Sequence, residues 1–246
     1  MLEPDLSGRI GLVTGSSSSG IGRAFLLALA DAGADVAVHY NESEAAAEAT
    51  AGAARERGVE AITVGADLTD PDEVDGCFGA VEADLGTVDV LVNNVGDFAP
   101  DHWESIDMDT WDRVFDTNLT ATMLCSKRAL GSMREAGWGR IVNVGYAAAE
   151  RAAVAPENFP YLVAKTGVVM FTRMVAADTR DDGITVNAVS PYVVETSDAF
   201  PEEAPRGRWA RGSDVVQALL FFLDEGSAYV SGENVEIDGG WLPEDV

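Results

Sequence analysis

The sequence predicts an α/β fold: a single domain, residues 1–246, with a doubly wound parallel sheet of about seven strands, Rossmann-like, and helices on both faces. Two observations support this prediction. Short apolar runs rich in β-branched residues alternate with longer stretches of helical periodicity, which is typical of right-handed β-α-β crossovers. A glycine-rich turn, Gly15 to Gly22, joins the first apolar run to the first helical stretch.

The expected elements follow from these periodicities. The apolar runs that are candidate strands are Ile10–Val13, Val36–His39, Ala61–Val64, Val88–Val92, Arg140–Val144, Ile184–Val189 and Asn234–Ile237. The helical stretches between them lie near residues 21–32, 42–57, 71–84, 104–135, 160–181 and 213–224. No internal repeat or interdomain linker interrupts this alternation.

The charge of the chain excludes some classes of partner. It has 42 acidic and 16 basic residues, which gives a formal net charge of -26. Nucleic acid and anionic membrane surfaces are not expected partners, because both require a basic binding surface. The acidic residues are dispersed, for example through 67–75, 97–112 and 178–182, and the chain has few lysines. This pattern indicates a halophilic protein, since high salt screens the repulsion among its carboxylates.

The cysteines and the amino terminus favour a cytoplasmic, soluble protein. Cys77 and Cys125 are isolated thiols without C-x-x-C spacing, which indicates a reducing compartment or core packing and predicts no disulfide or metal site. The amino terminus lacks the basic and apolar regions of a signal peptide. No apolar run approaches the ~18 residues of a membrane-spanning helix.

Two motifs indicate chemistry. The glycines of the turn Gly15 to Gly22 let backbone amides approach a pyrophosphate, whose charge the following helix amino terminus favours. Tyr161 and Lys165 are four residues apart, so on a helix they share one face. An ammonium beside a phenol lowers the phenol's pKa and prepares it for proton transfer.

The order and separation of the motifs resemble the classical short-chain dehydrogenase/reductase family, most closely its 3-oxoacyl-reductase-like branch. The resemblance spans Gly8 to Trp241. The motifs that carry it are Thr14–Gly22, Asp67-Leu68, Asn93-Asn94-Val95-Gly96, Asn118, Tyr161 with Lys165, Ser190-Pro191 and Val235–Gly240. The glycine turn holds one serine more than the family pattern.

The resemblance implies a nicotinamide dinucleotide cofactor. Asp67 should accept from the adenine amino group with Leu68 beneath the ring, and Asn93 and Gly96 should line a ribose. The implied cofactor-binding residues are Gly15, Ser16, Ser19, Gly20, Ile21, Gly22, Asn41, Asp67, Leu68, Asn93, Gly96, Tyr161, Lys165, Pro191, Val194 and Thr196.

NADP(H) is favoured over NAD(H). An acidic residue just after the second strand would grip the ribose 2′-OH and repel a 2′-phosphate. The second strand offers no carboxylate before Glu42, and His39-Tyr40 resembles NADP-using relatives. The arginine that such relatives commonly place nearby is missing, and only Arg23 is at hand.

The resemblance also implies catalytic roles. Tyr161 would be the acid/base, Lys165 would lower its pKa and bind the nicotinamide ribose, and Asn118 would continue a proton relay through water. The serine that normally polarises the substrate carbonyl is absent, and Tyr146 stands at its place. Tyr146 either supplies a hydroxyl or only lines the pocket.

Two further departures lie on the substrate side. The usual Pro-Gly turn reads Pro191-Tyr192, which replaces a residue that tolerates positive φ with a bulky one. The segment from Thr196 to Arg206 is about half the family's substrate lid, so an open pocket is expected.

The chain is therefore expected to be an NADP(H)-dependent oxidoreductase that interconverts a ketone and a secondary alcohol. Two alternatives stay open. A weakly active or non-catalytic cofactor-binding protein would explain the missing serine, glycine and lid together. A pteridine- or enoyl-type reductase also dispenses with that serine. The resemblance further implies a homo-oligomer, a tetramer or dimer, assembled through the long helices near 104–135 and 160–181 and the last helix and strand.

Overall fold

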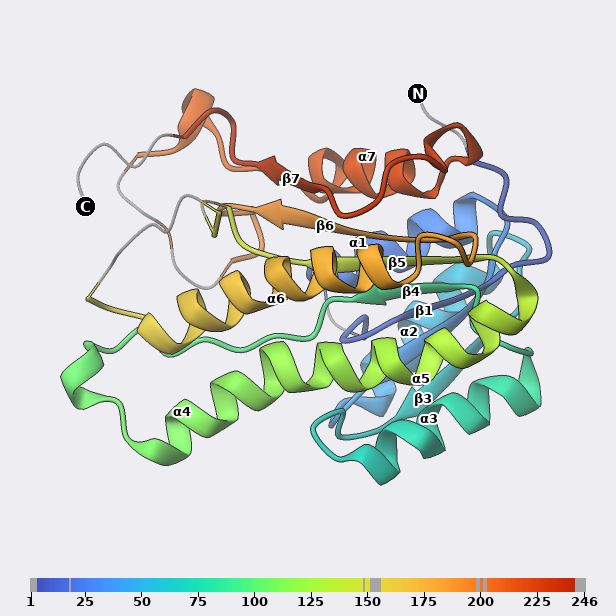
Figure 1. The fold of residues 1–246 in the computed structure, drawn as a ribbon, viewed down its shortest axis with the longest axis horizontal. Helices are drawn as coiled ribbons and strands as arrows, with labels where there is room; N and C mark the ends of the chain where they lie inside the picture. The colour runs from blue at the N-terminus through green and yellow to red at the C-terminus, as the bar shows by residue number, and fades with distance from the viewer. Residues whose placement is uncertain are drawn as a thin grey trace.

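A computed structural model describes residues 4–17, 19–147, 149–150, 156–197, 200 and 203–241. These residues form a parallel seven-stranded sheet in the order β3-β2-β1-β4-β5-β6-β7 (Figure 1). The strands are β1 (Ile10–Val13), β2 (Asp35–Tyr40), β3 (Ala61–Gly65), β4 (Val90–Asn93), β5 (Gly139–Val144), β6 (Ile184–Pro191) and β7 (Asn234–Ile237). Each strand lies where the sequence predicted one, with ends shifted by a few residues, and the predicted fold class is confirmed.

Successive side chains of a strand point to opposite faces of the sheet, and here the side chains on both faces are apolar. Helices therefore pack against both faces. Val36 and Val38 belong to the core beneath α1 (Ile21–Asp31), α2 (Glu44–Arg55) and α7 (Gly212–Leu223). Ala37 belongs to the opposite core, beneath α3 (Pro71–Asp84), α5 (Ala121–Ala136) and α6 (Phe159–Asp178). The sheet is thus buried between two helical layers.

The stretch expected as one helix over 104–135 is divided in the structure. A short 3-10 turn (Trp103–Ser105) precedes α4 (Met108–Phe115), whose first turn is capped by the carboxylate of Asp107. A π-helical turn (Asp116–Thr120) then separates α4 from α5. A π-helical turn inserts one residue into a continuous helix, and helical periodicity in a sequence cannot reveal that insertion. Turns of this kind are frequent at functional sites.

The strand order reverses between β1 and β4. Loops from neighbouring strands therefore diverge there, and they leave a crevice at the carboxyl ends of the strands. The glycine turn follows β1, and the segment that begins with Asn94 follows β4. Both segments border this crevice, so the fold places the motifs together.

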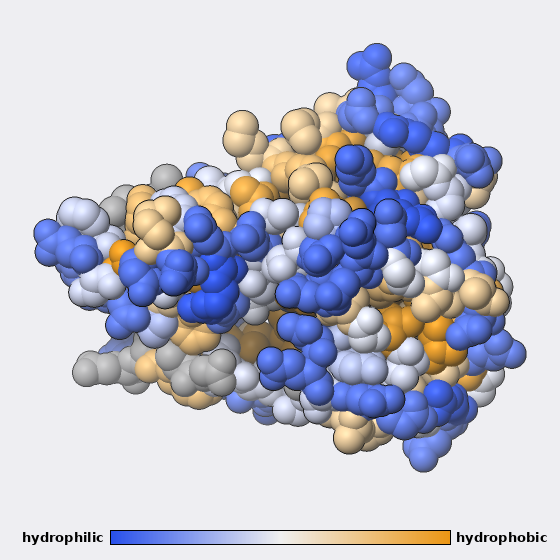
Figure 2. All heavy atoms as spheres, turned by 90° about the horizontal axis from the view of Figure 1, so that it is seen from below, coloured by the Kyte–Doolittle hydropathy of each residue, from blue (hydrophilic) through white to orange (hydrophobic). Residues whose placement is uncertain are grey.

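No helix in the described part of the chain is long and apolar enough to cross a membrane. Figure 2 shows hydrophilic side chains over much of one face of the molecule, with hydrophobic patches between them. We expect added salt to stabilise the protein, because counterions screen the repulsion stored by a net charge of -26. The melting temperature should rise between about 0.1 M and about 3 M potassium chloride. A constant melting temperature would contradict salt adaptation.

Candidate active site

The glycine turn after β1 requires glycine at two positions. Gly15 has φ of 63°, a left-handed conformation that glycine adopts without steric cost. A Cβ at Gly22 would lie 2.5 Å from both the Asn94 Nδ2 and the Gly15 carbonyl oxygen. The turn leads into α1, and the N-cap residue of that helix, Gly20, has no side chain to cap its first amides. Its free backbone amides suit an anionic group such as a pyrophosphate.

Two residues expected to bind the cofactor lie inside the protein. The Ser16 hydroxyl donates to the Val13 carbonyl and accepts from the His39 amide. The Asn93 amide group donates to the Ser126 hydroxyl at 3.0 Å and to the Asn143 side-chain oxygen at 2.8 Å. Both side chains are almost completely buried, these bonds join them to neighbouring segments, and neither residue lines the cleft described below.

Asn94, which the sequence did not single out, takes the position at the surface of the crevice. Its Nδ2 donates to the carbonyls of Thr14 at 2.9 Å and Gly15 at 3.2 Å. The Thr14 hydroxyl in turn accepts from the Asn94 amide at 2.8 Å. Asn94 therefore ties the end of β4 to the glycine turn. The signal in the sequence was the doubled asparagine, in which strand alternation sends only one member inward.

A cleft of about 550 Å³ lies above the carboxyl ends of the strands. This volume is typical of sites for small molecules and cofactors. The expected cofactor residues that line it are Gly15, Gly20, Ile21, Gly22, Gly96, Tyr161, Lys165, Pro191, Val194 and Thr196. The glycines that no Cβ would fit and the uncapped helix start are consistent with a bound dinucleotide.

The remaining expected cofactor residues do not line this cleft. Asn41 is exposed just after β2, and Leu68 is buried beyond the end of β3. One oxygen of Asp67 accepts from the amide and the hydroxyl of Thr69. Ser19 is exposed in the glycine turn, and the neighbouring Ser18 lies outside the described residues.

Tyr161 and Lys165 share one face of α6, as their spacing predicts. The Lys165 Nζ lies 5.7 Å from the centroid of the Tyr161 ring and donates to the Val144 carbonyl at 2.7 Å. Burial lowers the pKa of Lys165 to about 8. Burial, with a smaller contribution from Tyr146, raises the pKa of Tyr161 well above its ordinary value. The expected lowering of the Tyr161 pKa is therefore wrong for this arrangement, because desolvation of the phenolate dominates.

Asn118 lies in the π-helical turn between α4 and α5. Its Nδ2 donates to the carbonyls of Asp97 at 2.6 Å and Val114 at 2.8 Å. Its Oδ1 is buried without a hydrogen-bond partner among the described residues. A buried acceptor left unpaired costs about 1–3 kcal/mol, which one bound water would offset. The site thus has the acceptor that a water relay needs.

Gly96 brings the relay asparagine and the lysine together. A Cβ at this position would lie 2.7 Å from the Asn118 Oδ1 and 3.3 Å from the Lys165 Nζ. The backbone of Gly96 therefore approaches both polar groups at a distance that no other residue permits. Residues from three separate segments converge at this point of the cleft.

The described side-chain contacts of Tyr146 are ring contacts. The ring is edge-on to Tyr161, with centroids 5.6 Å apart, and 6.3 Å from the ring of Tyr192. Burial raises the pKa of Tyr146 to about 12, so its phenol stays protonated at neutral pH. Its service as a substitute for the missing serine stays a prediction.

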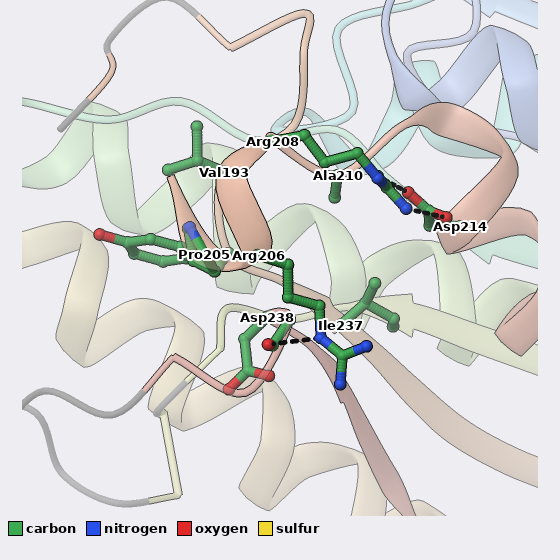
Figure 3. Close-up of a pocket in the computed structure, with 10 residues that line it drawn as sticks. Val193, Pro205, Arg206, Arg208, Ala210, Asp214, Ile237 and Asp238 are labelled. Atoms are coloured by element: carbon green, nitrogen blue, oxygen red, sulfur yellow. Dashed lines mark hydrogen bonds and ion pairs between the residues drawn. The ribbon is translucent and has the colours of Figure 1, made fainter. Parts of the chain in front are cut away.

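A smaller cavity of about 190 Å³ adjoins the cleft (Figure 3). Tyr192 is among the residues that line each of the two. Arg208 forms a two-bond ion pair with Asp214, with nitrogen–oxygen distances of 2.6 and 3.0 Å. The Arg206 Nε donates to the Gly239 carbonyl at 2.9 Å. Residues 198–199 and 201–202 of the expected short lid lie outside the described residues.

Comparisons with known proteins agree on one kind of relative. A family model described as enoyl-(acyl carrier protein) reductase matches residues 15–242. A 3-oxoacyl-[acyl-carrier-protein] reductase from Synechocystis sp. is 34% identical over an alignment of 245 positions, and the match covers 96% of this chain and 98% of the relative. Nodulation protein G from Azospirillum brasilense is 31% identical over 96% of this chain and 98% of its own length.

A solved structure extends this comparison. The gluconate 5-dehydrogenase from Burkholderia cenocepacia, in complex with NADP and tartrate, superposes with a TM-score of 0.89. It is 28% identical, and the match covers 100% of this chain and 99% of that chain.

Proposed function

Because the chain belongs to the classical short-chain dehydrogenase/reductase family and is an NAD(P)-dependent oxidoreductase of that family, we propose that it interconverts a ketone and a secondary alcohol with NADP(H). One observation carries the proposal. Asn118 and Lys165 converge at Gly96, where they leave no room for a Cβ, in a cleft that Tyr161 also lines. Turnover of a panel of ketones with NADPH tests the proposal directly.

Tyr161, Lys165 and Asn118 have different roles in the proposed proton transfer. Nicotinamide, when bound, supplies or accepts the hydride at the carbonyl carbon. Tyr161 gives the balancing proton to the substrate oxygen during reduction and takes it back during oxidation. Its raised pKa keeps the phenol protonated at neutral pH, which suits reduction. Lys165 and a water at the Asn118 Oδ1 would return the proton from solvent.

The proposed preference for NADP(H) has support near the glycine turn. The Arg23 Nε donates to the Thr50 hydroxyl at 3.3 Å, and that hydroxyl donates to the Ser17 carbonyl at 3.2 Å. Arg23 therefore lies beside the turn, within the region where the adenosine half would bind. Asn41, at the end of β2, brings no negative charge.

We expect NADPH to bind at least about tenfold more tightly than NADH, equivalent to 1.4 kcal/mol. Titration by the fluorescence of the five tryptophans measures both dissociation constants. The variant Arg23→Gln should weaken NADPH and leave NADH unchanged, because only the former has a 2′-phosphate. Tighter binding of NADH by the wild-type protein would overturn the preference and indicate Asn41 or Glu42 as the ribose ligand.

Because the serine that normally polarises the substrate carbonyl is absent, two other functions also have to be tested. NADPH binding without turnover of any ketone would favour a non-catalytic cofactor-binding protein. Activity confined to conjugated substrates would favour a pteridine- or enoyl-type reductase. A cytoplasmic location and the extent of the single domain, 1–246, stay predictions.

We also propose that the protein is a homo-oligomer, a tetramer or dimer. Met170 and Met174 on α6 are 72% and 61% exposed, and Met123 on α5, in the same helical layer, is exposed as well. Exposed large apolar side chains on these two helices suit the interface expected there. Light scattering should give a mass of two or four chains, and a monomeric mass would contradict the proposal.

A further inference from the structure

Four aromatic side chains form a continuous series that begins at the acid/base. Tyr161 contacts Tyr146, Tyr146 contacts Tyr192, and Tyr192 stacks on Trp241. The last two rings are nearly parallel, with an interplanar angle of 13° and centroids 3.9 Å apart. We name these four residues the aromatic wall.

The sheet holds the outer half of the aromatic wall in place. Tyr192 follows β6 directly, and its amide donates to the Ile237 carbonyl at the end of β7 at 3.2 Å. Trp241 comes four residues after Ile237, so the paired ends of β6 and β7 carry the two stacked rings. Because Tyr192 also lines the cleft, its ring is a preformed surface at the substrate end.

The charged side chains along the cleft also limit the kind of substrate that it can bind. Asp97 and Lys165 are the only charged side chains among the described residues that line it. Asp97 forms an ion pair with Arg113, and Lys165 is buried and donates to the Val144 carbonyl. Across Tyr192, Asp214 neutralises Arg208. Apart from the buried Lys165, the described lining of the cleft therefore offers an anionic substrate no cation, and Arg206 in the adjoining cavity donates to the Gly239 carbonyl.

From this arrangement we propose that the substrate is an uncharged ketone with an aromatic ring next to the carbonyl group, or the corresponding alcohol. The inference rests on the proposed function. The carbonyl oxygen lies at the Tyr161 hydroxyl, and the substrate ring lies along Tyr192, which Tyr146 supports from behind the cleft lining. Aromatic rings attract one another in tilted and offset arrangements at centroid distances of about 4.5–7 Å. Tyr192 is thus the specificity-determining residue, and Trp241 positions it.

Matched substrates test the aromatic wall. Acetophenone and cyclohexyl methyl ketone have similar shapes, but only the first has an aromatic ring. Their ratio of kcat/KM removes effects common to both. We expect Tyr192→Leu to lower the ratio about 2- to 10-fold, which is the range for one aromatic contact. Trp241→Leu should lower it in the same direction and less. Tyr229→Leu, at a fully exposed tyrosine, is the matched control and should leave the ratio unchanged.

A charged probe tests the second half of the proposal. 4-Acetylbenzoate adds one negative charge to acetophenone, and we expect its kcat/KM to be at least about tenfold lower. NADPH affinity equal to that of the wild type shows that a variant is folded. If Tyr192→Leu does not fold, the Trp241→Leu ratio decides.

Three results would overturn the inference. They are an unchanged ratio in the folded Tyr192 and Trp241 variants, equal or faster turnover of 4-acetylbenzoate, and turnover confined to an aliphatic ketone such as ethyl acetoacetate. The last result would leave the proposed ketone reduction intact. NADPH binding without turnover of any ketone would instead contradict the proposed function itself, and the inference with it.

Discussion

Replacement of Tyr161 by phenylalanine is expected to lower kcat about 10²–10⁴-fold and to leave cofactor binding intact. The change removes one oxygen and keeps the ring, so the edge-on contact with Tyr146 should persist. The substitution removes the hydroxyl that is proposed to exchange a proton with the substrate oxygen. Steady-state turnover of a ketone with NADPH measures the loss, and tryptophan fluorescence measures the cofactor affinity.

Two other Tyr→Phe variants serve as references for this result. Tyr229→Phe alters a fully exposed side chain and should have no effect. Tyr146→Phe distinguishes the two roles considered for that residue. Loss of a hydroxyl that bonds to the transition state would cost about 2.7–4 kcal/mol, whereas a residue that contributes only its ring would lose almost nothing. Wild-type turnover by Tyr161→Phe would refute the proposed mechanism.

The sheet could be predicted because most of its strands are buried. In β2, Val36, Ala37 and Val38 are all buried, since helices cover both faces. Such strands appear in a sequence as short apolar runs and are hard to miss. The division of the stretch over 104–135 could not be predicted, because a π-helical turn keeps the helix continuous and alters only its phase.

The site was predictable as a set of motifs and not as a set of contacts. Motif order located the cleft, but it did not show which member of Asn93-Asn94 turns toward it. Ser16 illustrates the same limit: a hydroxyl in a phosphate-binding turn reads as a ligand, although here it bonds Val13 and His39. Direction depends on the twist and pleat of the finished sheet.

Burial determines the pKa of Tyr161, and the four-residue spacing between Tyr161 and Lys165 in the sequence does not reveal that burial. Four residues of helix place Lys165 near the phenol, and this proximity alone would lower the pKa of the phenol. In the folded chain both groups are desolvated, and the lysine donates to a backbone carbonyl. Desolvation acts on both pKa values against the charged forms, and it dominates here.

The second large effect is expected at Gly96. In Gly96→Ala the new Cβ would lie 2.7 Å from the Asn118 Oδ1 and 3.3 Å from the Lys165 Nζ. Asn118 cannot turn away freely, because its Nδ2 holds the carbonyls of Asp97 and Val114. The added methyl group therefore displaces the relay asparagine or the lysine.

We expect Gly96→Ala to lower kcat by about 10²-fold, since a displacement of about 1 Å at a catalytic group can have that effect. Gly76→Ala is the matched control: it lies in α3 with no atom within 4 Å of the added Cβ. An alanine there should raise the free energy of unfolding by about 0.5–1 kcal/mol and leave kcat unchanged. Chemical denaturation separates the two contributions, because an intact fold with reduced turnover assigns the loss to the site. Unaltered turnover in folded Gly96→Ala would show that the contact with Asn118 and Lys165 has no part in catalysis.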